Sequence, residues 1–376
     1  MLYGENQRRV GIRHDVRLQM HLDMGRNAAS FPAGEDFPDL SPVGLVHSRL
    51  GFLGTGILVS PYSVLTAAHV LRDRYTIPEP QPEDWTFQLG NDYRGEVSRY
   101  AVSKVSLHPG WTARLPYNGG AGDGDLFGLD LALLELKTPV TEVRPARLHL
   151  GGAEPLGSRL ILAGFGSLAR GRRGVTNPGN SQRLAGENIL DRVVENVDAD
   201  FLPEAYRGGL LAVDFDEPYG ATNSLASHTS VSGYLGTGDS DSIPLPYEAS
   251  TAMGDSGGPA FLHLDGAWKV VGVVSYGTGK SQYGDITVYT RVASQKAWLH
   301  ALLGRWPSAR HTGSGEWLKL DWFGHFTDLG NLWLFHEKFG WLYAPEDDPD
   351  AFWAWMPGLG WLWTSGKVHP FCYAAE

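Results

Sequence analysis

The chain has 376 residues, of which 42% are hydrophobic and 19% charged, a balance typical of a soluble globular protein. The formal charge of −11 argues against a nucleic-acid partner, because phosphate binding needs clustered Lys and Arg, and no run exceeds a pair such as Arg172-Arg173. No stretch approaches the roughly 18 consecutive apolar residues that a membrane span needs. The single cysteine, Cys372, excludes an internal disulfide, so packing must hold the fold together.

The first 41 residues are polar and irregular, and prolines at positions 32, 38 and 42 are expected to break any helix. The sequence therefore predicts a leader or docking arm over residues 1–41. The opening segment, Met1 to Asn6, lacks the basic and then apolar stretches of a secretory signal. We expect either an incomplete start or a protein that stays inside the cell.

Residues 42–303 predict an all-β domain. Short runs rich in Val, Ile and Leu and bounded by Gly, Ser and Pro are typical of strands in a sandwich or barrel. Such runs occur at 43–47, 56–59, 131–136, 160–163 and 270–275. Residues 167–250 are expected to form long surface loops with a few strands. Apolar residues at helical spacing predict a short closing helix over 294–303.

The composition changes after Gly304. Residues 304–316 predict a Ser/Gly-rich linker, and residues 317–376 predict a small β-repeat module that holds most of the 13 tryptophans. A 20-residue period relates 333–343 to 353–363, which stacked aromatic β-hairpins would explain. The aromatic side chains either form the core of this module or provide a surface for stacking on polysaccharide or cell-envelope material.

Three segments carry candidate chemistry: Thr66 to His69, Asp130 to Leu136, and Gly254 to Pro259. Taken singly, each is an ordinary structural motif. Together they supply what a serine nucleophile needs, because its weakly nucleophilic hydroxyl requires a base within hydrogen-bond reach and a third group that orients the base. We therefore predict Ser256 as nucleophile, His69 as general base and Asp130 as the orienting carboxylate.

The glycines around Ser256 allow a sharp turn in the backbone. The N–H groups of Gly254 and Ser256 are predicted to form an oxyanion hole for the charge that develops during acyl transfer. The same segment also matches the G-x-S-x-G nucleophile elbow of α/β-hydrolases, so an esterase of that fold is an alternative. Chain order disfavours it, because the acid and the histidine follow the serine in that fold, whereas His69 and Asp130 precede Ser256.

On these motifs, residues 42–303 resemble the trypsin/chymotrypsin family of serine peptidases. Three further segments are similar to family strands: Ala163 to Gly166, Val274 to Gly277, and Tyr289 to Val292. The resemblance implies two six-stranded antiparallel β-barrels followed by a C-terminal helix, and it implies peptide-bond hydrolysis through an acyl-enzyme without a cofactor.

The chain departs from the animal members of the family. Gly54 and Val70 occupy the positions of the two half-cystines that usually staple the histidine loop. The segment Asp214 to Asp216 is similar to one in disulfide-free bacterial members. The resemblance therefore implies a bacterial protein and an extracytoplasmic or secreted location.

The resemblance also implies the substrate-binding residues. Ser250 is expected at the base of the primary specificity pocket, with Gly277 and Thr287 on its walls and Ser275 and Tyr276 on the substrate-binding strand. Without a carboxylate at the base, we expect small or medium apolar P1 residues to be preferred over Lys and Arg.

Two carboxylates bear on these expectations. Glu248 could enter the pocket only through a shift of the loop. In the family, the carboxylate before the nucleophile pairs with a freed N-terminal amine, which implies this role for Asp255, with Arg13 as an alternative cation. Processing would then free a new N-terminus near Val10 to Ile12.

We expect no metal, because Asp123, Asp125 and Asp130 lack the other ligands and the glycine of a calcium loop. The expected partner is a polypeptide substrate, with polysaccharide or cell-envelope contact through residues 317–376. The alternative from a different class is a catalytically silent binding module on the same fold.

Overall fold

The computed structural model describes most of the chain, in ranges separated by short gaps. These ranges are residues 10–75, 79–120, 122–177, 181–194, 208–220, 222–226, 235, 238–277, 281–307, 309–312, 316–329, 332–345 and 351–375. The chain divides into two compact units, Met1–Lys296 and Ala297–Glu376, and each is described by itself.

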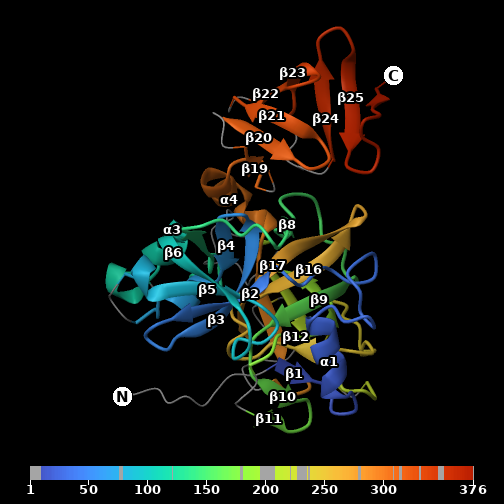
Figure 1. Cartoon of the computed structure of the whole chain (residues 1–376). Coiled ribbons are helices and arrows are strands. Elements are labelled where there is room, and N and C mark those ends of the chain that lie inside the picture. The colour runs from blue at the N-terminus through green and yellow to red at the C-terminus, as the bar shows by residue number, and fades with distance from the viewer. Residues whose placement is uncertain are drawn as a thin grey trace. The chain divides into compact units, whose positions relative to one another are not determined.

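The first half of the first unit is a closed six-stranded antiparallel barrel (Figure 1). Val, Leu and Ile are the main residues of its interior. In the strand β3 (Leu53–Ser60), six of the eight residues are buried. The barrel order is β2-β3-β4-β7-β6-β5. Its strands are β2 (Val43–Ser48), β3 (Leu53–Ser60), β4 (Ser63–Thr66), β5 (Trp85–Leu89), β6 (Ser98–Leu107) and β7 (Ala132–Leu136).

An eight-stranded sheet forms the second half of this unit. Its main path runs β12-β9-β16-β17-β18-β14-β13, and β8 pairs with β17 in parallel. The sheet curls around a core that includes Leu160, Leu211, Leu262 and Tyr289, and no ring closes among the described strands. The all-β prediction is confirmed, with the second barrel curled into a half-barrel. The strands are β8 (Arg147–Leu148), β9 (Arg159–Gly164), β12 (Leu184–Ile189), β13 (Arg192–Val193), β14 (Leu210–Asp214), β16 (Pro259–Leu264), β17 (Ala267–Gly277) and β18 (Ile286–Arg291).

The N-terminal segment is more regular than its composition indicates. A four-stranded sheet of order β11-β10-β1-β15 contains β1 (Val10–Ile12), β10 (Leu168–Arg170), β11 (Gly174–Asn177) and β15 (Ala249–Ser250). Ile12 is fully buried beside Leu162 and Leu184, and the helix α1 (Leu18–Gly25) packs Leu18 and Leu22 against this cluster. The expectation of no helix in the arm is wrong, because all three prolines follow α1. Residues 1–9 lie outside the described residues.

The helices of the fold are short. Residues 293–303 form the closing helix in two parts, a 3-10 turn and then α4, which confirms the prediction over 294–303. None of the helices in the described ranges has the length and apolar character that crossing a bilayer demands. Besides α1, the helices are α2 (Ala68–Leu71), α3 (Pro109–Ala113) and α4 (Lys296–Leu303), with 3-10 turns η1 (Pro82–Asp84), η2 (Pro116–Asn118) and η5 (Ala293–Gln295).

The second unit is an antiparallel meander in which each strand pairs with the next in the chain. The 20-residue repeat corresponds to two hairpins of equivalent register, with Trp333 opposite Tyr343 in the first and Trp353 opposite Trp363 in the second. The strands are β19 (Arg310–His311), β20 (Trp317–Leu320), β21 (Gly324–Asp328), β22 (Trp333–His336), β23 (Gly340–Tyr343), β24 (Ala351–Met356), β25 (Gly360–Ser365) and β26 (Tyr373–Ala374).

The predicted linker contributes to the core of the second unit. Trp306 and Ala309 are buried among Phe326, Leu334 and Phe352. The indole N–H of Trp306 donates to the carboxylate of Asp328 over 2.7 Å. The interpretation of 304–316 as a linker is therefore wrong for these residues, because burial of apolar area outweighs the Ser/Gly-rich composition around them.

Candidate active site

The three predicted catalytic side chains meet between the barrel and the curled sheet. His69 lies on α2, Asp130 lies two residues before the start of β7, and Ser256 lies in the loop before β16. His69 Nε2 is 2.8 Å from Ser256 Oγ, and His69 Nδ1 is 2.6 Å from Asp130 Oδ2. Asp130 is fully buried. A continuous chain of hydrogen bonds therefore joins hydroxyl, imidazole and carboxylate.

Asp130 is held by three donors in addition to the imidazole. The backbone N–H of His69 donates to its Oδ1 over 2.9 Å, and the Ser275 hydroxyl donates to its Oδ2 over 2.6 Å. The Thr290 hydroxyl donates to its carbonyl oxygen. Burial alone would raise the pKa of Asp130, but the charge of His69 and these hydrogen bonds hold it below the usual value. The Ser275 side chain thus supports the Asp130 carboxylate. The sequence analysis had instead predicted that Ser275 binds substrate.

The nucleophile loop is fixed by contacts with β3. The Thr55 hydroxyl donates to the Gly254 carbonyl, and the Thr55 N–H donates to the Ser256 carbonyl, each over 2.9 Å. Gly254 has a φ of 97°, a conformation that favours glycine. Within the described residues, the N–H groups of Gly254 and Ser256 donate no hydrogen bond. They therefore remain available for an oxyanion.

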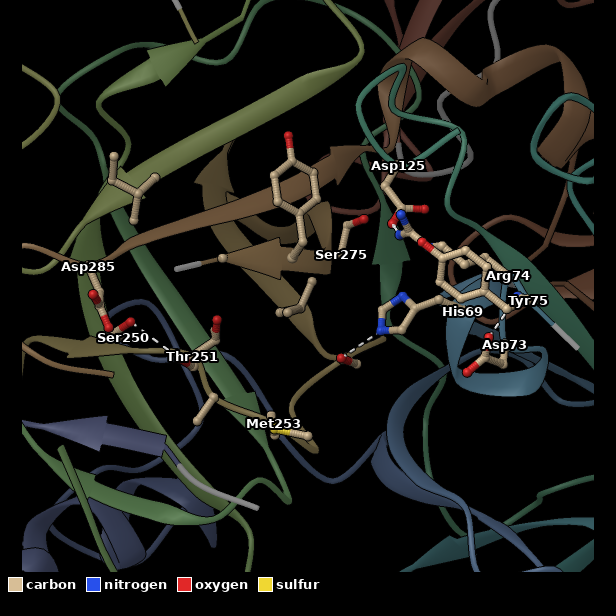
Figure 2. Close-up of a pocket in the computed structure, with 16 residues that line it drawn as sticks. His69, Asp73, Arg74, Tyr75, Asp125, Ser250, Thr251, Met253, Ser275 and Asp285 are labelled. Carbon is tan, nitrogen blue, oxygen red and sulfur yellow. Dashed lines mark hydrogen bonds and ion pairs between the residues drawn. The ribbon is translucent and has the colours of Figure 1, made fainter. Parts of the chain in front are cut away.

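A cleft of about 380 Å³ opens beside His69 and Ser256. In Figure 2, Ser250, Thr251 and Asp285 lie to one side of His69, whereas Arg74 and Tyr75 lie to the other. Of the predicted substrate-binding residues, Ser250, Ser275, Tyr276 and Gly277 line the cleft. Thr287 does not line it.

Thr287 instead organises the base of the cleft. Its hydroxyl is 2.9 Å from the hydroxyl of Thr251 and 3.3 Å from that of Ser250. The Ser250 and Thr287 side chains are almost fully buried. The base is therefore a neutral network of hydroxyl groups whose polar atoms bond one another.

A family model for the trypsin-like peptidase domain matches residues 54–273, more than half of the chain. The chain belongs to the trypsin-like peptidase family. The α/β-hydrolase alternative is wrong, because Ser256 lies between two β-barrel halves and not on a parallel sheet flanked by helices.

The curated proteins to which the chain is similar include the following three. It is 28% identical to serine protease 56 of Mus musculus over 308 residues and 30% identical to serine protease 56 of Homo sapiens over 280 residues. These matches cover 78% and 71% of the chain but only 42% and 38% of the relatives. It is 26% identical to a trypsin of Phaedon cochleariae over 291 residues, which covers 73% of the chain and 92% of that trypsin.

The positions of the missing half-cystines are adjacent in the structure. A Cβ atom added to Gly54 would lie 2.5 Å from Val70 Cγ1. The valine side chain thus fills the space that a second side chain would need. Cys372 is exposed and free.

Asp255 lies in a cradle of glycines. Its oxygens accept hydrogen bonds from the N–H groups of Gly166 (2.8 Å) and Ala252 (3.0 Å). Added Cβ atoms at Gly164 and Gly166 would fall within 2.4 Å of its carboxylate, so only glycine fits at either position. Burial raises the pKa of Asp255 to about 7.

The cation expected for Asp255 is not Arg13. The guanidinium of Arg13 instead donates to Asp15, over 2.8 and 3.0 Å, and to the carbonyl of Leu245 over 2.7 Å. The alternative pairing with Arg13 is therefore wrong. Pairing of Asp255 with a processed N-terminus stays a prediction.

Glu248 does not line the cleft. Each of its carboxylate oxygens accepts a backbone N–H over 2.7 Å, one from Asp216 and the other from Leu245. It is one of four buried carboxylates that lie near one another, together with Asp191, Asp214 and Asp216. Burial, and then the neighbouring negative charges, raise the pKa of Asp216 to about 9.

Sequence reasoning missed the residues that border the cleft beyond His69. Arg74 forms an ion pair with Asp125, and the indole N–H of Trp111 donates to the same carboxylate over 2.7 Å. Asp123 is paired with Arg114. In the described part of the chain, no group of three or more His, Cys, Asp or Glu side chains could hold a metal ion.

Proposed function

We propose that this chain is a serine endopeptidase that uses His69, Asp130 and Ser256. The hydrogen-bond chain from Ser256 through His69 to the buried Asp130 is the observation that carries the proposal. In this mechanism the histidine takes the hydroxyl proton as the serine oxygen bonds to the scissile carbonyl carbon, and it then gives that proton to the departing amine. Water repeats the sequence on the acyl-enzyme and releases the acid.

The electrostatic half of the mechanism rests on the nucleophile loop. The free N–H groups of Gly254 and Ser256 would donate to the oxyanion, and donors fixed before the reaction need no reorganisation in the transition state. Hydrogen bonds from Thr55 support this preorganisation, because they fix both neighbouring carbonyl groups.

Covalent labelling tests this function. A fluorophosphonate should label the full chain at Ser256, and peptide mapping should find the adduct there. Ser256→Ala should abolish labelling, and His69→Ala should slow it strongly. A properly folded chain that takes up no label would favour the catalytically silent binding module.

We propose that the peptidase prefers small or medium apolar P1 residues. The hydroxyl groups of Ser250, Thr251 and Thr287 bond one another at the base, so a buried cation there would find no charge to pair with. Glu248 is held away by two backbone N–H groups.

Asp285 provides the strongest test of this preference, because its carboxylate borders the same cleft. A P1 substrate library should give higher kcat/KM for Ala, Val or Leu than for Lys or Arg. Efficient cleavage after Lys or Arg that disappears in Asp285→Asn would overturn the preference. The same result with Glu248→Gln would show that the loop moves in solution.

We also propose a bacterial origin and an extracytoplasmic place of action. The similarity of residues 214–216 to disulfide-free bacterial members supports this proposal. Fractionation of a native host followed by antibody detection would test the location, and an exclusively cytoplasmic signal would contradict it.

A further inference from the structure

One face of the second unit's sheet carries a ladder of aromatic side chains. Side chains at i and i+2 on a strand share a face, and residues opposite one another in the register do so as well. Phe335 lies opposite Trp341, and Tyr343 lies opposite both Trp333 and Trp355, which joins the two hairpins. The aromatic ladder consists of Trp317, Trp333, Phe335, Trp341, Tyr343, Trp353, Trp355, Trp361, Trp363 and Tyr373.

This ladder lies outside the core of its unit. All ten side chains are at least partly exposed, and Trp341 and Trp361 expose 48% and 40% of their surface. The opposite face holds the core, where Phe326, Leu334 and Phe352 are fully buried. So many aromatic rings on one open face exceed the scattered apolar exposure of an ordinary surface and indicate a binding function.

The rings of the ladder support one another in fixed orientations. Trp333 meets Trp341 at 79° and Trp355 at 89°, and Phe335 meets Trp341 at 72°. Such edge-to-face contacts are the favoured arrangement of aromatic pairs. The exposed rings are therefore preorganised, which lowers the entropy lost on binding.

The ladder offers hydrogen-bond donors but little charge. Among the described residues, no hydrogen bond is found for the indole N–H groups of Trp341 and Trp361. The basic residues that the register of the described strands puts on this face are Arg310, Lys319 and His325, and Arg310 is ion-paired with Asp321. Residues 297–376 contain five Lys and Arg against nine Asp and Glu, so anionic membranes and polyanions are disfavoured partners.

We propose that the aromatic ladder binds a neutral polysaccharide. A sugar ring presents an apolar C–H face that stacks on an aromatic ring, and its hydroxyl oxygens accept hydrogen bonds from indole N–H groups. An extended peptide would instead pair its backbone with an edge strand, since its own N–H groups need acceptors that the ladder largely lacks. The ladder crosses successive strands, which suits a long polymer. This inference goes beyond the peptidase function and does not depend on it.

Co-sedimentation of the full chain with microcrystalline cellulose and with insoluble chitin tests the proposal. We expect depletion of the protein from the supernatant that persists at high salt. The double substitution Trp341→Leu with Trp361→Leu should weaken binding about 100-fold, at roughly tenfold per ring. Trp341→Tyr with Trp361→Tyr should retain most of the binding. Leu359→Ala, at an apolar residue that is 64% exposed outside the ladder, should change nothing.

Peptide cleavage by every variant should equal that of the parent, which separates this test from the function of the first unit. Failure of the full chain to sediment with either polysaccharide would overturn the proposal, and so would undiminished binding by the leucine pair. Binding of a decaproline peptide that the leucine pair loses would identify a proline-rich segment as the ligand instead. If the full chain formed a dimer and the leucine pair were monomeric, the ligand of the ladder would be a second copy of this chain.

Discussion

In most proteins charged side chains are exposed and large apolar side chains are buried, and the two units depart from this pattern in different ways. In the trypsin-like unit, charged groups such as Asp130 and Asp255 are buried, each satisfied by several donors. In the second unit, large apolar rings such as Trp341 and Trp361 are exposed. Both departures cost stability, and both lie where a function is proposed. The comparison teaches that, in both units, the proposed function coincides with exceptions to normal burial.

The largest expected effect would test the first unit. Ser256→Ala should lower kcat by about 10⁶, the magnitude typical of the loss of a nucleophile from such a triad. Cleavage of a small peptide substrate measures it, with Leu359→Ala as a control that keeps full activity. Near-normal activity of Ser256→Ala would show that Ser256 is not the nucleophile and that the buried polar groups beside it are not catalytic.

A smaller loss would show whether Asp130 acts through the imidazole. Asp130→Asn keeps the shape of the side chain but favours the wrong histidine tautomer, which costs about 10⁴ in kcat in chymotrypsin-like peptidases. Ser275→Ala removes only one donor to Asp130 and should cost far less. Asp123→Asn is the matched control, and a larger loss there than at Asp130 would mean that the wrong carboxylate has been chosen.

Stability measurements would compare the two faces of the sheet in the second unit. Phe352→Ala should destabilise the second unit by about 3–5 kcal/mol, because it leaves a cavity in the core. Trp361→Ala, on the exposed ladder, should cost far less. Denaturant titration followed by tryptophan fluorescence would compare them. Equal losses would show that the ladder belongs to the core after all.

The last test concerns the pH dependence of the stability of the first unit. Because the pKa of Asp216 rises from 3.8 to about 9 on folding, the folded state holds the proton more tightly across that window. Its contribution is therefore most favourable below pH 4 and declines as pH rises, by about 1.4 kcal/mol per pH unit at most. Asp191 and Glu248 should act in the same direction, since their pKa values are raised to about 8 and 7.

Asp216→Asn isolates this contribution. The unfolding free energy of the parent should fall relative to the variant between pH 5 and pH 9. A constant difference over that range would mean that Asp216 is ionised in the folded protein.

Sequence reasoning succeeded where a function demands particular residues at particular places. His69, Asp130 and Ser256 could be predicted because the chemistry of a weak nucleophile restricts its partners, and the structure brings all three together. The hairpin repeat was equally accessible, since Gly340 and Gly360 recur at turns with φ of 69° and 80°, which favour glycine.

The remainder depended on contacts that no local pattern encodes. Ser275 was assigned to substrate, but its hydroxyl bonds Asp130, which is 145 residues away in the chain. Trp306 looked like part of a linker because its neighbours are Ser, Pro and Gly. Asp285 and Arg74 line the cleft from loops, and only the tertiary fold brings loops of that kind together.

The strand β1 has a consequence for how the first unit folds. Gly11 pairs with Ser250, so the base of the specificity cleft is joined to a segment about 240 residues earlier in the chain. Contacts at such separation carry a high loop-closure entropy and form late. A nascent chain that has not yet delivered β15 cannot assemble this cleft.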